Sequence, residues 1–375
     1  MAIYRSMSGG RRALPLDRAL RYEAAMPFTL PALSSPLAMP FDTVIDVRSP
    51  DEFAEDHLPG AISLPVLDNE ERAVVGTIYK QESPFKARKL GAALLARNAA
   101  RHLEGPLAAM EGGWQPLVYC WRGGQRSNAF ATILAQVGWR TEVLAGGYQS
   151  YRRAVVARLY EEDLPHRFVL IDGDTGTAKT EILHKVAARG GQCLDLEGLA
   201  NHRGSVLGPR PGGQPSQKML ESRLVAALAA LDPARPVLVE AESSKVGDLL
   251  VPPAVWKAMR AAPRVRVQAS VEDRARYLAR AYADICADPE ALKDILSLLV
   301  RLQGRERVDT WKGMVEAGDF ETLAHDLITR HYDSRYAKSR SAAGEPAVRM
   351  EIELDAAGLE RAADRVLDAV LRLRG

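Results

Sequence analysis

Two short loops, each between an apolar segment and a helical segment, constrain the fold of this chain more than any other feature. The first is Cys120-Trp121-Arg122-Gly123-Gly124-Gln125-Arg126-Ser127, directly after the apolar residues 117–119. The second is Gly173-Asp174-Thr175-Gly176-Thr177-Ala178-Lys179-Thr180, directly after residues 168–172. A strand that passes through a loop into a helix is the unit of parallel α/β sheets. We therefore expect an α/β protein with two parallel-sheet domains.

The other segments extend this pattern along the chain. Residues 1–37 are irregular, with Met26 as a second candidate start, and the two domains are assigned to 38–155 and 156–375. The expected strands are 42–47, 117–119, 168–172, 192–196, 236–240 and 348–354. One expected helix begins at Pro50, and others span 87–97, 127–137, 180–188 and 358–373. Gly138 is the expected C-cap of the helix 127–137. A charged helix at 151–166 is interpreted as the linker.

The composition argues against a membrane-spanning or secreted protein. Every apolar run is shorter than the roughly 20 residues of a membrane-spanning helix, and the N-terminal residues do not form the apolar core of a secretory signal. Three cysteines in 375 residues indicate a reducing compartment, and we expect a cytoplasmic protein. A net charge of +2 permits a nucleic-acid partner without indicating one.

Cys120 lies where its thiol would be activated. The N–H groups of the loop and of the following helix favour an anion, and Arg122 and Arg126 add positive charge. The pKa of the thiol is therefore expected to be lowered, which stabilises a thiolate, or a persulfide or perselenide carried on the sulfur. A buried structural cysteine is the alternative. The other two cysteines, Cys193 and Cys286, are interpreted as core or incidental residues.

The second loop has the context of a phosphate-binding P-loop, between an apolar strand and a helix. Its backbone N–H groups would cradle a diphosphate, Lys179 would reach the diphosphate oxygens, and Thr180 would ligate Mg²⁺. The pattern departs from the usual one at Ala178, where glycine is expected. Because alanine tolerates positive φ poorly, this argues against ordinary ATP hydrolysis more than against diphosphate binding. A chance turn is the alternative.

Two acidic residues mark the end of the expected strand 236–240. Glu240 and Glu242 lie where this strand end would meet the P-loop. Either is a candidate metal ligand or general base, and a plain strand-end carboxylate is the equally weighted alternative.

Residues 38–155 resemble the rhodanese domain family. The resemblance rests on Asp46-Val47-Arg48, His57-Leu58-Pro59-Gly60-Ala61, the Cys120 loop and Gly146-Gly147-Tyr148, in this order. It implies that the cysteine carries a transferable chalcogen atom and that residues 122–127 bind the chalcogen anion. Asp46, Arg48 and His57 are interpreted as fold-stabilising residues.

A rhodanese domain followed by a P-loop domain resembles the tRNA 2-selenouridine synthase family. Three further strings carry the resemblance: residues 65–72 with 75–81, residues 194–205, and His331-Tyr332-Asp333. It implies a rhodanese-like parallel-sheet domain followed by a P-loop NTPase-like α/β domain with a helical, basic C-terminal part.

The same resemblance implies a reaction in which selenium replaces the sulfur of wobble 2-thiouridine in tRNA. Geranyl diphosphate first alkylates the sulfur, and selenium from selenophosphate then displaces the geranyl thiol. The P-loop would stabilise the diphosphate leaving group, and Cys120 with its arginines would deliver selenium. The implied partners are tRNA, selenophosphate and geranyl diphosphate, with no membrane. No tightly bound cofactor is implied, apart from Mg²⁺ as a candidate at the P-loop.

The residues that bind tRNA are expected at about 270–340, in the basic helical part, and beside the P-loop. The candidates, which share a cationic or aromatic side chain, are His202, Arg203, Arg274, Arg276, Arg280, His331 and Tyr332. The arginines would follow the phosphates, and His331 with Tyr332 would stack on a base. A solvated helix surface with paired charges is the alternative.

Two other functions are compatible with the sequence. A plain rhodanese-type sulfurtransferase would use Cys120 to move sulfur from thiosulfate to a thiol, but it would leave the P-loop without a role. A nucleotide-regulated binding module would dock a partner through an inactive rhodanese domain, but docking needs no thiolate. Thiocyanate formation tests the first function, and nucleotide turnover with and without tRNA tests the second.

Overall fold

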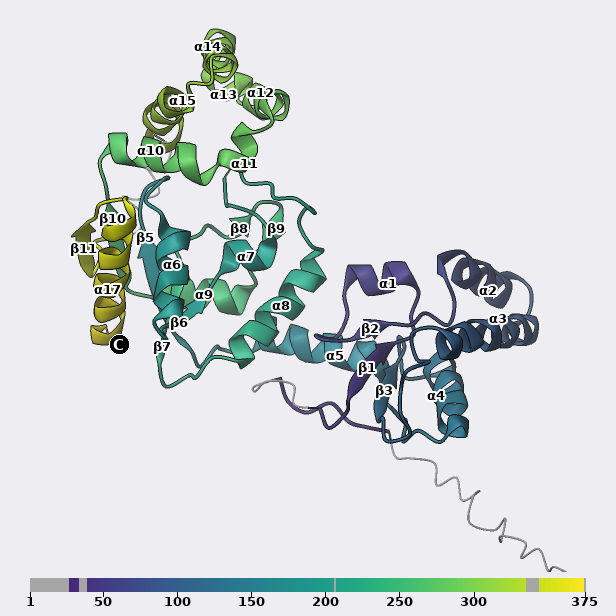
Figure 1. Ribbon diagram of the computed structural model, residues 1–375. Coiled ribbons are helices and arrows are strands. Elements are labelled where there is room, and N and C mark those ends of the chain that lie inside the picture. Colours follow the sequence, from purple (N-terminus) through teal and green to yellow (C-terminus); the bar gives the residue numbers. More distant parts are fainter. Residues whose placement is uncertain (1–26, 34–38, 206, 335–343, 374–375) are drawn as a thin grey trace, which may run out of the picture.

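The computed structural model describes residues 27–33, 39–205, 207–334 and 344–373 and contains two parallel β-sheets, each flanked by helices (Figure 1). The predicted α/β fold with two parallel-sheet units is confirmed. Within the described ranges, no helix has the length and apolar character needed to cross a membrane.

The first sheet has the strand order β2-β1-β3-β4, and all neighbouring strands are parallel. Its strands are β1 (Thr43–Asp46), β2 (Ile62–Ser63), β3 (Pro116–Tyr119) and β4 (Glu142–Val143). Its helices are α1 (Pro50–Glu55), α2 (Asn69–Gln81), α3 (Pro84–Glu104), α4 (Gln125–Val137) and α5 (Gly147–Val156). Every residue of β3 is buried, so the Cys120 loop leaves the sheet from an apolar, internal strand. Gly138 closes α4 with a φ of 111°, as the sequence predicts.

The second sheet has the order β11-β10-β5-β7-β6 and is also parallel. Its strands are β5 (Arg167–Asp172), β6 (Gln192–Leu194), β7 (Pro236–Glu240), β10 (Arg264–Gln268) and β11 (Val348–Glu351). The accompanying elements are α6 (Lys179–Ala188), α7 (Leu196–Ala200), α8 (Gln217–Ala229), α9 (Pro253–Ala261), α17 (Ala356–Arg372) and the hairpin of β8 (Lys245–Val246) and β9 (Leu249–Leu250). Because β5 is central, the P-loop emerges from the middle of the sheet, between the ends of its neighbours.

A helical part is inserted between β10 and β11. It consists of α10 (Val271–Ala281), α11 (Ala283–Cys286), α12 (Pro289–Ser297), α13 (Val300–Gln303), α14 (Arg305–Glu316), α15 (Phe320–Leu327) and a π-helix (Ile328–Tyr332). Figure 1 places these helices beyond the sheet edge at which β5 ends. Their own core surrounds Trp311, which is fully buried and donates its indole N–H to Asp326 at 2.7 Å.

Segment 151–166, interpreted from the sequence as a charged linker, is instead largely part of the core. Tyr151 and Leu159 are fully buried and belong to one apolar cluster with Leu224 of α8 in the second domain. The two domains therefore share a hydrophobic core. This correction has a simple cause, since a helix with charges on one face and apolar residues on the other buries the apolar face.

The charges of this helix also serve the domain contact. Arg152 forms an ion pair with the buried Glu221 of α8, and Tyr160 donates to the same carboxylate at 2.6 Å. On the neighbouring edge, Lys218 pairs with Glu55 at the end of α1 at 2.5 Å. Polar contacts thus surround the shared apolar core.

Part of the expected N-terminal extension packs on the first domain. Phe28 forms a parallel bridge with Leu144, and its ring meets Phe41 edge-on at 4.9 Å between centroids. Leu33 is buried in the core that the two domains share. The rest of the extension, including Met26, lies outside the described residues.

Candidate functional site

Cys120 directly follows β3 and is 4% exposed. Its Sγ lies 3.2 Å from Ser127 Oγ in the first turn of α4. The turn at Gly146 and Gly147 closes the loop from the other side, because the Tyr148 N–H donates to Cys120 O at 2.8 Å. A Cβ atom on Gly147 would lie 2.3 Å from Cys120 O, so this approach requires glycine. The Gly146-Gly147-Tyr148 string therefore holds the cysteine loop in shape.

The loop lowers the pKa of the Cys120 thiol, as the sequence predicts. Burial is the largest single effect and opposes ionisation, but hydrogen bonds from the Ser127 side chain and backbone, the charge of Arg126 and the Gly124 backbone outweigh it. Cys193 provides the contrast, because burial raises its pKa to about 12. Cys120 is therefore the cysteine suited to nucleophilic chemistry.

The two arginines of the loop have different surroundings. Arg126 forms an ion pair with Glu52 at 2.8 Å. Burial opposes ionisation of Glu52, but Arg126 together with other partners lowers the pKa of this carboxyl to about 2. Arg122 is exposed beside the loop. Since the charge of Arg126 is compensated by Glu52, Arg122 and the loop N–H groups are the main groups for a second anion next to the thiolate.

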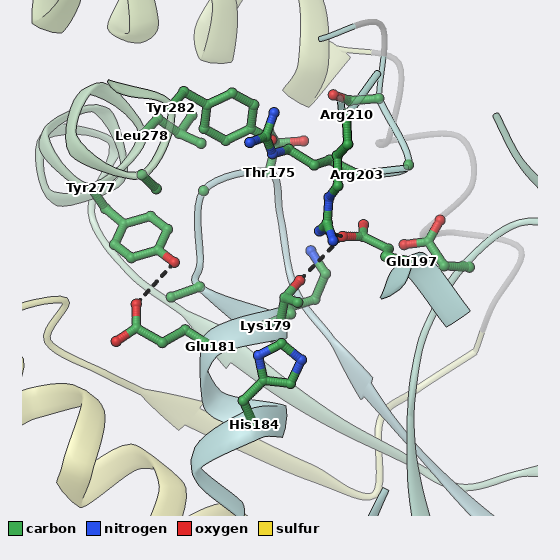
Figure 2. Close-up of a pocket in the computed structure, with 17 residues that line it drawn as sticks. Thr175, Lys179, Glu181, His184, Glu197, Arg203, Arg210, Tyr277, Leu278 and Tyr282 are labelled. Carbon is green, nitrogen blue, oxygen red and sulfur yellow. Dashed lines mark hydrogen bonds and ion pairs between the residues drawn. The ribbon is translucent and has the colours of Figure 1, made fainter. Parts of the chain in front are cut away.

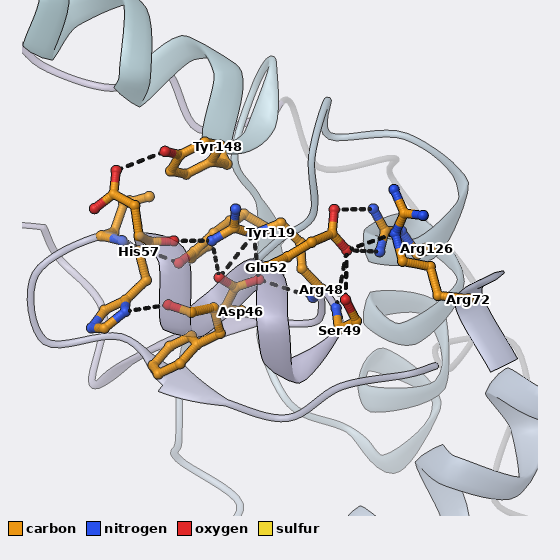
Figure 3. A network of polar contacts seen from close by, with 12 residues as sticks. Asp46, Arg48, Ser49, Glu52, His57, Arg72, Tyr119, Arg126 and Tyr148 are labelled. Carbon is orange, nitrogen blue, oxygen red and sulfur yellow. Dashed lines mark hydrogen bonds and ion pairs between the residues drawn. The ribbon is translucent and has the colours of Figure 1, made fainter. Parts of the chain in front are cut away.

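Asp46, Arg48 and His57 belong to a polar network around α1 (Figure 3). Arg48 is 1% exposed, forms an ion pair with Asp46 at 2.6 Å and donates to the Asp56 carbonyl at 2.6 Å. Its guanidinium also lies 4.0 Å from the centroid of the Tyr148 ring. His57 bonds a backbone carbonyl of α1 at 2.9 Å. These contacts join β1, α1 and α5, in agreement with the fold-stabilising role predicted for the three residues.

Replacing Ser127 by alanine is expected to raise the pKa of the Cys120 thiol, because the hydroxyl that stabilises the thiolate is lost. The rate of iodoacetamide alkylation against pH, read at the Cys120 peptide by mass spectrometry, measures this pKa. Ser297→Ala is the control, since its hydroxyl donates to Lys293 O at 2.8 Å in α12, within the helical part of the other domain. An unchanged profile in Ser127→Ala would mean that Arg126 and the backbone groups activate the thiol without this hydroxyl.

The P-loop leaves β5 and enters α6. Lys179 Nζ donates to the loop's own carbonyls, to Gly173 O at 2.9 Å and to Asp174 O at 3.4 Å, and Thr177 Oγ1 donates to Asp174 O at 2.8 Å. Ala178 has φ 56° and ψ 30°, a left-handed conformation that costs alanine about 1–2 kcal/mol. The loop thus adopts the conformation for which glycine is usual, in spite of the alanine.

A cavity of about 300 Å³ opens at this loop (Figure 2). Cations from two segments line it: Lys179 at the P-loop, and Arg203 and Arg210 between α7 and α8. Arg203 pairs with Asp284 at 2.6 Å and lies 5.0 Å from the centroid of the Tyr282 ring. Its buried Nη1 has no hydrogen-bond partner among the described residues. A guanidinium held in this way is suited to a phosphate oxygen, so the cavity can bind a diphosphate.

Three carboxylates, Glu197, Glu240 and Glu242, gather around Thr180. The Thr180 hydroxyl donates to Glu240 at 2.6 Å and lies 3.3 Å from Glu197. Burial, and after it the charge of Glu242, raises the pKa of Glu197 to about 7. Burial also raises the pKa values of Glu240 and Glu242. Such a concentration of buried negative charge favours a bound cation.

The oxygen atoms at this place fit Mg²⁺. The ligand types are a hydroxyl and carboxylates, and the second oxygen of Glu240 is buried without a hydrogen-bond partner in the part of the chain that the structure describes. Within the described part of the chain, no group of three or more His, Cys, Asp or Glu side chains is arranged to hold a metal. Magnesium here would therefore complete its shell with phosphate oxygens and water, as it commonly does.

The sequence reasoning assigned no role to Glu197 and Arg210, two charged residues that line this cavity. Glu197 lies just beyond the end of β6, as Glu240 ends β7, so the same strand-end argument identifies it. Arg210 lies in an irregular stretch without periodicity, and its ion pair with Glu197 at 3.8 Å is visible only in the structure.

The raised pKa of Glu197 predicts a pH-dependent stability. Between its ordinary value of 4.5 and about 7, the folded protein binds the proton more tightly than the unfolded chain. The free energy of unfolding should therefore fall as pH rises across this window. Glu197→Gln removes this contribution and should stabilise the protein at pH 8 by about 1–3 kcal/mol relative to wild type, measured by urea unfolding without Mg²⁺ or diphosphate. Glu272→Gln, an exposed position on α10, is the control, and a Glu197→Gln protein with the wild-type pH profile would contradict the assignment.

Four of the residues for which an RNA-binding role is predicted are buried, which argues against direct contact with RNA. The residues concerned, all less than a tenth exposed, are His202, Arg274, His331 and Tyr332. Arg274 donates to Thr175 O at 2.8 Å and pairs with Asp333 at 2.7 Å. It therefore braces the P-loop against the helical part, because a buried guanidinium needs full pairing.

The other three candidates have different positions. Arg203 points into the P-loop cavity and is placed for phosphate (Figure 2). Arg276 is more than half exposed and pairs with Asp273 at 2.5 Å. Arg280 is exposed and donates to Leu354 O at 3.1 Å. For Arg276 and Arg280, contact with RNA stays a prediction.

The two loops lie in different domains (Figure 1). Among the described residues that line the P-loop cavity, none belongs to the Cys120 loop. The two candidate anion sites are therefore separate and do not form one composite pocket.

Comparison with known families matches both parts of the chain. The family described as "Rhodanese-like domain" matches residues 30–154. The family described as "tRNA 2-selenouridine synthase AAA domain" matches residues 166–294, which include the P-loop and the three carboxylates. The rhodanese-like and P-loop domains expected from the sequence are thereby confirmed.

Three curated relatives, each named tRNA 2-selenouridine synthase, cover both domains. The protein of Nitrosomonas europaea is 31% identical over 314 residues, which are 77% of this chain and 81% of the relative. That of Chromohalobacter salexigens is 35% identical over 68% of this chain and 69% of its own length. That of Alcanivorax borkumensis is 34% identical over 70% of this chain and 75% of its own length.

Proposed function

The chain belongs to the tRNA 2-selenouridine synthase family, and from this we propose that it replaces sulfur by selenium in the wobble 2-thiouridine of tRNA. One observation carries the proposal. A cysteine with a lowered pKa and a P-loop cavity lined by cations and carboxylates occur in one chain, in separate domains. A reaction with two steps, one at each site, uses both.

We assign the first step, S-geranylation, to the P-loop. The sulfur of 2-thiouridine attacks C1 of geranyl diphosphate, the C1–O bond breaks, diphosphate leaves and N3 of the uridine loses its proton. The loop N–H groups, Lys179 and Arg203 would stabilise the charge on the leaving group. Among the described residues, Lys179 Nζ donates only to neutral carbonyl oxygens of its own loop. It can exchange these for the more strongly attracting diphosphate oxygens.

Glu240 and Glu242 have different roles in this step. Bound Mg²⁺ supplies positive charge to the diphosphate, and Thr180 and Glu240 would hold it, since their side chains are already joined at 2.6 Å. Glu242 lines the cavity and its pKa is raised by burial. It is therefore suited to accept the proton that N3 loses.

We assign the second step, selenation, to the Cys120 loop. Selenium from selenophosphate attacks C2 of the S-geranyl nucleoside, the C2–S bond breaks and geranyl thiol leaves. Water then splits the selenium–phosphorus bond and releases phosphate. We propose that the Cys120 thiolate takes the proton of hydrogen selenophosphate as the selenium attacks and returns it to the leaving geranyl thiolate, while Arg122 and the loop N–H groups hold the selenium-bearing anion. Such a free thiolate supports a reducing, cytoplasmic location.

The proposal is tested by incubating the full chain with 2-thiouridine tRNA, geranyl diphosphate, selenophosphate and Mg²⁺, followed by mass spectrometry of the nucleosides. We expect 2-selenouridine, preceded by an S-geranyl species that accumulates when selenophosphate is omitted. Unchanged 2-thiouridine together with thiocyanate formation from thiosulfate and cyanide would overturn the proposal in favour of a plain sulfurtransferase.

A further inference from the structure

We infer that an apolar crevice between α10, α11, α12 and α15 binds the hydrocarbon chain of the diphosphate substrate. The inference rests on the proposed function, which supplies a diphosphate with such a chain. The crevice has a volume of about 50 Å³, and its walls include Ala279, Ile285, Phe320 and Leu323. It is thus a carbon-lined space next to a strongly polar one.

The crevice is continuous with the phosphate cavity. Thr175 of the P-loop, Leu278 and Tyr282 line both spaces, and Figure 2 shows the three side by side above Lys179. A ligand with its phosphates at the loop can therefore extend directly along α10 into the crevice. Arg274 fixes this geometry, because it donates to Thr175 O from within α10.

The apolar side chains that line the crevice favour a hydrocarbon over a nucleobase. A base needs several hydrogen-bond partners, whereas the crevice is formed mainly by aliphatic and aromatic carbon. The volume of about 50 Å³ exceeds the roughly 10–15 Å³ that a cavity needs to hold one water, so the crevice has room for the end of a hydrocarbon chain. The cavity of about 300 Å³, which Leu278 and Ala281 also line, holds the diphosphate and the first carbons.

The test compares three ligands on the full-length protein by calorimetry with Mg²⁺: inorganic diphosphate, dimethylallyl diphosphate and geranyl diphosphate. We expect the dissociation constant to fall with chain length, by roughly tenfold or more between inorganic and geranyl diphosphate. Ala279→Phe fills the crevice and should abolish this gain while leaving the affinity for inorganic diphosphate unchanged. Ala283→Phe, the same substitution at an exposed position of α11 outside both spaces, is the matched control.

Cys286 provides a second readout that needs no variant. Its side chain lines the crevice, so geranyl diphosphate should slow its alkylation by N-ethylmaleimide, measured by peptide mass spectrometry, and inorganic diphosphate should not. Affinities independent of chain length, or equal alkylation rates with both ligands, would overturn the crevice assignment.

The two proposals fail in different ways. Chain-length-dependent binding without transfer of the geranyl group to tRNA would refute the proposed function and leave the crevice assignment in place. Transfer of the geranyl group by a protein that binds all three ligands equally would refute the crevice and leave the function in place.

Discussion

Cys120→Ser is expected to abolish selenation, with a loss of at least about 10³-fold in rate, and to leave geranylation intact. The serine hydroxyl is not ionised near neutral pH, so the hydrogen bonds that stabilise the Cys120 thiolate have no anion to act on. The S-geranyl nucleoside should therefore accumulate in place of 2-selenouridine. Nucleoside mass spectrometry, with both substrates present, measures the two species in one sample.

Cys193→Ala is the matched control for this substitution. Cys193 lies in β6, its Sγ donates to Leu183 O at 3.4 Å, and it belongs to neither loop. This variant should carry out both steps. If Cys120→Ser stopped geranylation instead, while Lys179→Ala left it intact, the assignment of the two loops to the two steps would have to be reversed.

Lys179→Ala is expected to slow geranylation by about 10²–10³-fold, the usual effect of removing one group that stabilises a developing charge. Lys179 lies at the start of α6 with its Nζ against the P-loop carbonyls, where it is placed for the diphosphate leaving group. Selenation of tRNA that already carries the S-geranyl group should be unaffected. Single-turnover rates for each step, measured separately, show this selectivity.

Lys185→Ala removes a lysine from the same helix and is the control. Lys185 pairs with Glu360 of α17 at 2.6 Å and does not line the P-loop cavity. Its loss should leave both rates near those of wild type. A Lys179→Ala protein that geranylates normally would contradict the role of this lysine and direct attention to Arg203 and Arg210.

The sequence predicts the two reactive loops because each combines several independent signals. A run of apolar residues predicts β3 and β5, and helical periodicity with suitable end residues predicts α4 and α6. These patterns are local, so the fold class and the positions of Cys120 and Lys179 follow from them. Glu240 follows as well, since parallel strands of one sheet end at the same edge.

The remaining features depend on contacts between residues distant in sequence. Arginine is rarely buried unless it is paired, so the sequence suggests that Arg274 is exposed. The partner that allows its burial, Asp333, lies 59 residues away. The apolar face of segment 151–166 is a local pattern, but its packing with Leu224 and the ion pair of Arg152 with Glu221 of α8 depend on distant residues. The apolar crevice requires α10 and α15 to meet beside the P-loop. No local pattern contains this information.

The core that the two domains share determines whether the domains or the tRNA move between the two proposed steps. Tyr151 and Leu159 pack with Leu224, and ion pairs surround this contact, so we expect the domains to behave as one body. In the proposed reaction, the anticodon of the tRNA would then have to leave one domain and bind to the other, so the tRNA moves and the two domains do not. The S-geranyl tRNA can dissociate while it moves between the two sites. An excess of competing tRNA should therefore increase the fraction of S-geranyl tRNA that is released before selenation.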